Sequence, residues 1–331
     1  MMSPVKQALK WGYTLAAARF GAHRRHQKQP RLWVLMYHRV LPKGDPRYAL
    51  EEPGMLVTPE TFSQHLEWVK EQFEVVDLAD WVTKAQQGEP LPNKACAITF
   101  DDGWRDNYEF ALPLLEQHRV PATLFAVADK IGTDFRFWPN IVSELVAGKA
   151  PQLGEHPYFK EAASLAEHGF DREGIAQVIA GLKQYSEAEI FKALEGIGWQ
   201  QALSTSEPAL MDWQQLQEMA DSGWVTIGSH TCTHQRLDKG FDASALVEEV
   251  EASRAKLEAR LQRPVPLFCF PNGDYDAAAL GVVERCYQAA VTTRKGINVV
   301  GQGSWHELLR VGLHEDGSGT KRGFLAKMAG W

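Results

Sequence analysis

The sequence predicts an α/β protein built on parallel strands, and two features of its hydrophobic pattern support this fold class. From residue 32 onward, short apolar runs alternate with longer amphipathic segments. Several of the short runs are apolar without alternation, as is typical of strands covered on both faces. Repeated strand–helix alternation implies parallel strands joined by right-handed crossovers, and therefore an α/β barrel or an open sheet.

The individual elements follow from these runs and from the residues at their ends. Strands are expected at 32–37, 73–78, 95–100, 122–128, 224–229, 266–270, 289–293 and 308–313. Helices are expected at 59–72, 78–87, 105–118, 210–222, 242–263 and 275–287. Thr58 followed by Pro59 marks a helix start, and Asp274 is the expected N-cap of the last of these helices. The glycine-containing segment 316–323 lacks the spacing of a phosphate-binding loop, and we expect an ordinary loop there.

Residues 134–209 interrupt this alternation. They contain helical patterns around 139–148, 158–168 and 174–195 and no convincing strand. No linker rich in proline or glycine separates them from the flanking segments. We therefore expect a helical insertion within one domain over 32–331, beside the mouth of the active site.

The charge is unevenly distributed along the chain. The formal net charge is −7, which argues against a general nucleic-acid-binding protein because such proteins carry a basic surface. Residues 1–31 nevertheless form a basic N-terminal arm with seven lysines and arginines and no acidic residue. Two interpretations are open: a helix that makes peripheral contact with an anionic membrane, or a basic segment that packs on the acidic body or frays.

The composition also indicates in which cellular compartment the protein is expected. No apolar run reaches the length of about 18 residues that would predict a membrane-spanning helix. The four cysteines include no C-x-x-C pair, which suits a reducing environment. We expect a cytoplasmic protein, peripheral to the inner face of the membrane if the arm contacts lipid.

Side chains suited to metal binding and acid–base chemistry follow the predicted strands. In parallel α/β barrels the catalytic groups collect at the carboxyl ends of the strands. Five groups of residues follow strand ends, and four of them contain such side chains. The residues just past these ends are His38; Asp101, Asp102 and Gly103; Ser229, His230 and His234; Pro271, Asn272 and Gly273; and His314.

Two of these groups together predict a site for one divalent cation. His230 and His234 are spaced i, i+4, which places two imidazoles on one side of a helical turn. Asp102 at another strand end supplies a carboxylate, and this ligand set leaves positions open for water and substrate. Asp101 would then be free to act as general base on the water held by the metal. The alternative is that the two aspartates only form a turn or cap a helix.

These residues carry a resemblance to a known family. The segments "TFDDG" (99–103) and "HTCTH" (230–234) resemble the polysaccharide deacetylase family, metal-dependent carbohydrate esterases with the NodB homology fold. The segments "LMYHRV", "RVPATLFAV" and "FPNGDYD" are similar in kind and order, so the resemblance covers roughly 32–130 and 210–315. It implies a distorted (β/α) barrel of about seven parallel strands with a helical insertion.

The resemblance also implies roles for matching residues. Asp101 matches the general base, and Thr231 would hold the second motif by a hydrogen bond. The metal ligands are matched by Asp102, His230 and His234.

A third motif and a general acid complete the implied site. Pro271, Asn272 and Gly273 match the motif that walls the substrate groove, where the backbone N–H of Asn272 would help to bind the oxyanion. His314 is the candidate for the general acid that protonates the leaving amine.

Three departures from the family pattern leave roles open. Cys269 stands where many members have an arginine that steadies the base, and Arg310 is a candidate to take over that function. Asn272 replaces the usual aromatic residue. The family's fourth motif has no clear match in this sequence, so no partner for His314 is identified. His38 is expected either to line the pocket or to form its hydrogen bonds with the backbone.

The implied activity is hydrolysis of an N-acetyl group from a sugar of a poly- or oligosaccharide, with one divalent ion as cofactor. Zn²⁺ is the expected ion, and Co²⁺, Ni²⁺ or Fe²⁺ would suit the same ligands. One alternative is a deacylase or deformylase of a lipid- or nucleotide-linked sugar in surface polysaccharide or lipopolysaccharide assembly. Another is an inactive, metal-containing glycan-binding protein.

Overall fold

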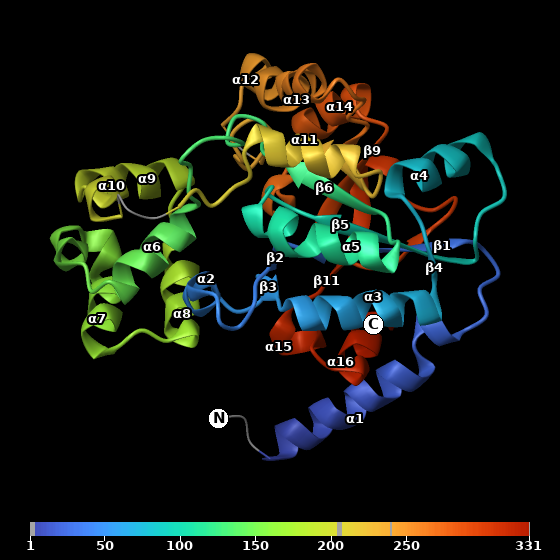
Figure 1. Cartoon of the computed structure of the whole chain (residues 1–331), viewed down its shortest axis with the longest axis horizontal. Coiled ribbons are helices and arrows are strands. Elements are labelled where there is room, and N and C mark those ends of the chain that lie inside the picture. The colour runs from blue at the N-terminus through green and yellow to red at the C-terminus, as the bar shows by residue number, and fades with distance from the viewer. Residues whose placement is uncertain (1–3, 204–206, 239, 331) are drawn as a thin grey trace.

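The computed structural model describes residues 4–203, 207–238 and 240–330, and a closed parallel β-barrel lies at its centre (Figure 1). Seven parallel strands of the described chain form the barrel, which closes because β1 pairs with both β5 and β11. The predicted barrel of about seven strands is therefore confirmed. The strands are β1 (Arg31–Tyr37), β5 (Lys94–Phe100), β6 (Ala122–Ala126), β7 (Val225–Ser229), β8 (Leu267–Cys269), β9 (Ala289–Lys295) and β11 (Leu308–Gly312).

Short strands extend the barrel at its edges. The strand expected at 73–78 is only β4 (Glu74–Val75), which pairs with β5 outside the closed ring. β10 (Asn298–Val299) pairs antiparallel with β1. A separate two-stranded sheet joins β2 (Arg39–Val40) to β3 (Leu56–Val57) beside the carboxyl end of β1.

Helices cover the barrel on its outside. They are α3 (Pro59–Gln72), α5 (Leu112–His118), α11 (Trp213–Asp221), α12 (Ala243–Val247), α13 (Ser253–Leu261) and α14 (Ala277–Cys286). A further helix, α4 (Leu78–Gln87), packs Leu78, Trp81 and Val82 against the apolar cluster inside the barrel. α3 begins as expected, with the Thr58 side chain accepting from the Thr61 amide and Pro59 in the first turn. The expected cap of α14 is wrong by two residues: Asp276, not Asp274, accepts from the Ala279 amide. The helices expected at 105–118 and 242–263 contain π-helical turns at Asn107–Ala111 and Glu248–Ala252.

Alternation along the strands sorts their side chains into two cores. One set of apolar residues, contributed by six of the strands, gathers inside the barrel. This set includes Leu32 and Val34 of β1, Ala95 and Ala97 of β5, Phe125 of β6, Leu267 of β8, Ala289 and Val291 of β9 and Leu308 of β11. The alternate residues pack against the surrounding helices. By the same alternation, Asp101 and Arg310 point into the barrel at its carboxyl end.

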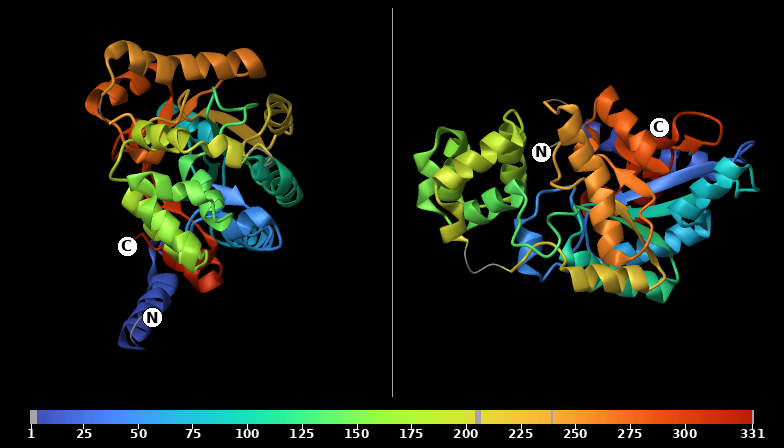
Figure 2. Two further views of the ribbon diagram at one scale, coloured as in Figure 1. Left: turned by 90° about the vertical axis from the view of Figure 1, so that its left-hand side faces the viewer. Right: turned by 90° about the horizontal axis from the view of Figure 1, so that it is seen from above.

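The interruption at 134–209 is a group of helices with a core of its own (Figures 1 and 2). The helices are α6 (Trp138–Ala147), α7 (Lys160–His168), α8 (Arg172–Leu182), α9 (Glu187–Gly196) and α10 (Trp199–Ala202). The pattern at 174–195 thus covers two helices, separated by a turn that ends at the N-cap Ser186. A short helix of the main body, α2 (Pro46–Leu50), lies between this insertion and the barrel.

The N-terminal helix and the C-terminal helices lie together on one side of the barrel (Figure 1). The arm is helical over α1 (Pro4–Phe20) and packs on α16 (Lys321–Lys327). The loop expected at 316–323 is wrong, because α15 (Glu315–Ser318) and α16 occupy most of it, and α16 is capped by the Thr320 hydroxyl. Among the described residues, none of the helices combines the length and apolarity needed to span a bilayer.

Candidate active site

The two adjacent aspartates sit in a strained turn just after β5. Asp102 has a φ of 76° and Gly103 a φ of 84°, so two successive residues adopt the left-handed region. This turn carries the two neighbouring carboxylates into one cavity, where both side chains are buried. Gly103 is needed for close approach as well, since a Cβ there would lie 2.9 Å from Ile131 Cδ1. A strained conformation in a non-glycine residue such as Asp102 is common at functional sites.

Three side chains converge as metal ligands would. Asp102 Oδ1 lies 3.4 Å from Nε2 of His230 and 3.4 Å from Nε2 of His234. The helical turn expected between the histidines is wrong: the segment is an irregular loop in which Thr231 and His234 have positive φ angles of 67° and 69°. Its shape is held by a hydrogen bond of 2.9 Å from the His234 amide to the Thr231 hydroxyl.

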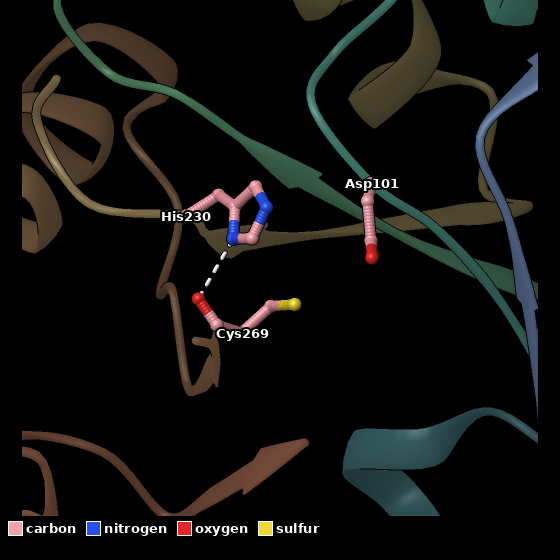
Figure 3. A group of neighbouring side chains, drawn as sticks. All are labelled: Asp101, His230 and Cys269. Atoms are coloured by element: carbon pink, nitrogen blue, oxygen red, sulfur yellow. Dashed lines mark hydrogen bonds between the residues drawn. The ribbon is translucent and has the colours of Figure 1, made fainter. Parts of the chain in front are cut away.

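The groups around these ligands fix their orientation. His230 Nδ1 is hydrogen-bonded to the carbonyl of Cys269 at 2.7 Å (Figure 3). This hydrogen bond leaves Nε2 of His230 to face Asp102. The indole N–H of Trp104 donates to Asp102 Oδ2 at 2.8 Å, so Oδ1 is left toward the histidines. Partners of this kind orient metal ligands in many proteins. Two imidazoles and one carboxylate fit Zn²⁺, Co²⁺, Ni²⁺ or Fe²⁺.

Burial and neighbouring charges shift the pKa values of Asp102 and His230. Burial alone would raise the pKa of Asp102, but hydrogen bonds with the two histidines hold it well below its ordinary value. Burial lowers the pKa of His230, and the neighbouring carboxylates raise it by more, so a bound cation would displace a proton there. A second set of donors, Asp101, His230 and Cys269, also lies close together. It fits a cation poorly, because the Arg310 guanidinium already contacts both Asp101 oxygens and lies 3.3 Å from the Cys269 thiol.

Asp101 is held by a buried arginine from β11, a strand that flanks β1 on the side away from β5. Arg310 donates to both carboxylate oxygens, at 2.7 and 2.8 Å, and its side chain is fully buried. Burial would raise the pKa of Asp101, but the charge and hydrogen bonds of Arg310 outweigh it, and the pKa is lowered. Cys269 lies beside this pair, with its thiol 3.3 Å from the guanidinium. The small side chain at 269 leaves space for Arg310, which reaches the base from β11.

The two candidate histidines lie in different surroundings. His38, just past β1, lines the same cavity as the metal-type residues, and its Nε2 is 3.8 Å from Asp101 Oδ2. His314 lines an adjoining cavity, which His38 and Arg310 also line, and its Nε2 is 3.4 Å from the ammonium of Lys327. The lining of the cavity that holds Asp102, His230 and His234 includes His38 and not His314. Burial and that ammonium lower the pKa of His314.

The third motif forms part of the cavity wall. Pro271 is buried, and Asn272 lines the cavity in a left-handed conformation with a φ of 55°. Gly273 is fixed by packing, since a Cβ there would lie 2.1 Å from the Thr293 hydroxyl. That hydroxyl donates to the Asn272 carbonyl at 2.9 Å, which fixes the turn against β9.

The helical insertion supplies the opposite wall. The cavity lies between the barrel and the insertion and has a volume of about 190 Å³. The insertion and the segment before it contribute Phe135, Phe137, Trp138, Asn140, Lys183, Glu187 and Phe191. Burial raises the pKa of Glu187, and it raises that of Glu52 on the adjoining loop. The prediction that the insertion lies beside the active-site mouth agrees with this lining.

Glu51, a buried residue at the end of α2, links the insertion to the barrel. Its carboxylate accepts from Arg39 at 2.6 Å and from Asn140 of α6 at 2.9 Å. Arg39 also donates to Asp106 at 2.9 Å and lies 4.1 Å over the ring of Trp104. A chain of contacts therefore runs from the insertion to the indole that holds Asp102.

Sequence reasoning missed several of these supporting residues. No role was predicted from the sequence for Trp104, Glu51 or Asn140. The position of Trp104 directly after "DDG" is a usable signal for an indole that turns back toward the motif. No local pattern marks Glu51, because its partners lie far away in the sequence.

Comparison with known proteins identifies the family. The family model described as "Polysaccharide deacetylase" matches residues 88–291. The chain belongs to the polysaccharide deacetylase family. This membership supports a hydrolase of the deacetylase class, and the family is generally metal-dependent. The match includes both aspartates and both histidines of the candidate site.

Individual polysaccharide deacetylases match over shorter segments. The chain is 28% identical over 107 residues to a putative polysaccharide deacetylase, YxkH, of Bacillus subtilis, covering 32% of this chain and 35% of that protein. It is 29% identical over 86 residues to the poly-beta-1,6-N-acetyl-D-glucosamine N-deacetylase of Escherichia coli, covering 26% of this chain and 13% of that protein. The alignments therefore span only a minor part of these relatives.

Solved structures share the fold over nearly the whole chain. The Streptococcus pyogenes deacetylase PplD in complex with acetate matches with a TM-score of 0.60 at 18% identity, covering 91% of this chain and 99% of that one. IcaB from Ammonifex degensii matches with a TM-score of 0.59 at 19% identity, covering 92% and 100%. At these identities the likeness shows the fold alone.

Proposed function

We propose that this protein is a metal-dependent N-deacetylase that removes acetyl groups from an N-acetylated sugar of a poly- or oligosaccharide. The observation that carries the proposal is the convergence of Asp102, His230 and His234 on the cavity that also holds the buried pair Asp101–Arg310. The E. coli and Staphylococcus epidermidis relatives named as poly-beta-1,6-N-acetyl-D-glucosamine N-deacetylases support the substrate class.

Asp102, His230 and His234 would hold one divalent ion, with Zn²⁺ the expected one. When bound, such an ion supplies Lewis acidity that lowers the pKa of a coordinated water and polarises a carbonyl. Asp102 is kept in its ligating orientation by Trp104, and His230 by the Cys269 carbonyl.

Asp101 acts as the general base. Arg310 keeps its carboxylate ionised and its two oxygens fixed, so that Asp101 is ready to take a proton from the attacking water. The amide N–H of Asn272 would stabilise the charge that develops on the carbonyl oxygen.

His38 is a better candidate for the general acid than His314. The leaving amine must be protonated by a group in the cavity that holds the base, and His38 lies there, 3.8 Å from Asp101. His314 lies in the adjoining cavity beside Lys327, an ammonium that disfavours the protonated imidazole. We therefore assign the acid role to His38.

One alternative substrate has a specific observation in its favour. A deacylase or deformylase of a lipid-linked sugar would work at a membrane surface, and α1 exposes large apolar side chains on a basic arm. A nucleotide-linked sugar gains no such support. The third possibility, an inactive glycan-binding protein, conflicts with the intact pair of base and arginine.

Acetate release tests the proposal. The protein is stripped with a chelator, reloaded with Zn²⁺ and incubated with N-acetylated oligosaccharides, with Asp101→Asn as the variant. We expect metal-dependent release in the wild type and a loss of about 10²–10⁴-fold in the variant. Retention of Zn²⁺ by Asp101→Asn is the control. Zn²⁺ binding without release from any oligosaccharide would overturn the glycan-deacetylase proposal and favour the lipid-linked substrate or the binding protein.

A further inference from the structure

The N-terminal helix exposes an apolar surface. Residues 11–20 contain a single charged residue, Arg19, yet in this segment only Ala17 and Ala18 are buried. The exposed large apolar side chains of the helix are Trp11 (53%), Tyr13 (52%), Leu15 (42%) and Phe20 (58%). Elsewhere in the described chain, Val247 on α12 is exposed in the same way, at 39%. A helix that is apolar around most of its circumference is normally covered on more than one side.

The base of this helix is fixed to the body, which argues against a frayed end. The amide of Ala22 donates to the Ala329 carbonyl at 3.0 Å. Gly21 lies so close that a Cβ there would be 2.6 Å from Ala329 Cα. Arg322 of α16 lies 5.3 Å from the ring centre of Trp11. The helix therefore projects from the body in a set direction, as the left view of Figure 2 shows.

Basic side chains surround the exposed apolar ones. The chain has no acidic residue before Asp45. Arg19 and Arg24 line a shallow hollow with Leu15, Leu325 and Arg322. Lys321 is paired with Glu71 at 2.6 Å and adds little free charge. The surface thus combines exposed aromatic rings with arginines, on a chain whose net charge is −7.

We propose that α1 docks this protein on the surface of an anionic lipid bilayer. Aromatic and aliphatic side chains insert at the boundary between headgroups and acyl chains, while arginines beside them pair with lipid phosphates. Positive charge concentrated on one arm of an acidic protein favours a negatively charged surface. A second copy of this chain is a weaker occupant, because the two arms would bring like charges together.

Vesicle binding tests this proposal without reference to catalysis. The full chain is sedimented with vesicles of phosphatidylcholine alone and with vesicles that also contain phosphatidylglycerol. We expect binding to the anionic vesicles that weakens as salt is raised, because salt screens the charges. The double variant Trp11→Ser/Phe20→Ser should lose binding by about tenfold or more, and so should Arg19→Glu/Arg24→Glu.

Matched controls separate docking from unfolding and from self-association. Val247→Ser removes an exposed apolar side chain elsewhere, and Arg285→Glu reverses an exposed charge on α14; both should bind as wild type does. Circular dichroism shows whether each variant is folded. No binding of the wild type to anionic vesicles, or equal binding to neutral ones, would overturn the proposal. A dimer in sedimentation velocity that Trp11→Ser/Phe20→Ser converts to monomer, without vesicle binding, would assign the surface to self-association instead.

Discussion

The two walls of the cavity are held in place by different kinds of contact. On the barrel wall, Asp101 and Asp102 are buried, and each is fixed by hydrogen bonds of 2.7–2.8 Å from Arg310 or Trp104. On the insertion wall, Asn140 and Glu187 are partly exposed. Hydrogen bonds to Glu51, from Asn140 of α6 and from Arg172 of α8, tie the insertion to the barrel side.

This difference in support suggests different roles for the two walls. We expect the barrel wall to carry the chemical step and the insertion wall to select the substrate. Groups that move protons or hold a cation must keep their positions to within a fraction of an ångström, and buried bidentate contacts provide this. A wall that only contacts the substrate tolerates looser support. Substitutions on the barrel wall should therefore change the chemical step or cation binding, whereas those on the insertion wall should change KM.

The two histidines provide the largest expected contrast. His38→Ala should lower kcat by about 10²–10⁴-fold, because it removes the acid proposed to protonate the leaving amine. His314→Ala should change kcat by less than about threefold, since His314 is not among the residues that line the cavity holding Asp101. The measurement is kcat for acetate release by the Zn²⁺-loaded variants. A large loss for His314→Ala with a small one for His38→Ala would reverse the assignment.

The sequence predicted the barrel wall better than its surroundings. Adjacent aspartates after an apolar run and two spaced histidines are local patterns, so Asp101, Asp102, His230 and His234 could be found without a structure. The choice between His38 and His314 depended on barrel closure. Because β1 pairs with β5, His38 is brought next to Asp101.

No local pattern settles the Arg310–Asp101 contact or the insertion wall, because both depend on contacts between segments that are distant in the sequence. Alternation on β11 directs Arg310 inward, but its meeting with Asp101 depends on the width of the barrel. The wall built by α6 and α9 depends on how a separate helical core sits against the barrel, and no local pattern encodes that position.

Arg310 should control the pH dependence of the base. Arg310→Lys keeps a positive charge but loses the two-pronged contact, so burial should raise the pKa of Asp101. Below that pKa the base is protonated and inactive, so the acidic limb of kcat/KM should move to higher pH. At neutral pH we expect a loss of about tenfold. A lower kcat/KM with an unmoved acidic limb would show that Arg310 supports structure rather than the protonation state of Asp101.

Trp104 should affect cation affinity more than the chemical step. Trp104→Phe removes the donor to Asp102 Oδ2 while keeping an aromatic ring beneath Arg39. Loss of such a partner weakens metal binding by about 10–100-fold. Competition with a chromogenic chelator measures the Kd for Zn²⁺. Unchanged affinity in the folded variant would contradict the role of the indole, and normal kcat at saturating Zn²⁺ is the expected control.

Asn140 provides the smallest expected effect and tests the insertion wall directly. Asn140→Ala removes the contact of α6 with Glu51, which remains paired with Arg39. A single hydrogen bond of this kind contributes about 1 kcal/mol, so KM should rise by about fivefold while kcat stays within about twofold. Gln217→Ala, which breaks an exposed hydrogen bond within α11, is the matched control and should leave both constants unchanged. A fall in kcat of more than about tenfold in Asn140→Ala would mean that the insertion positions the reacting groups, and that the two walls act as one unit.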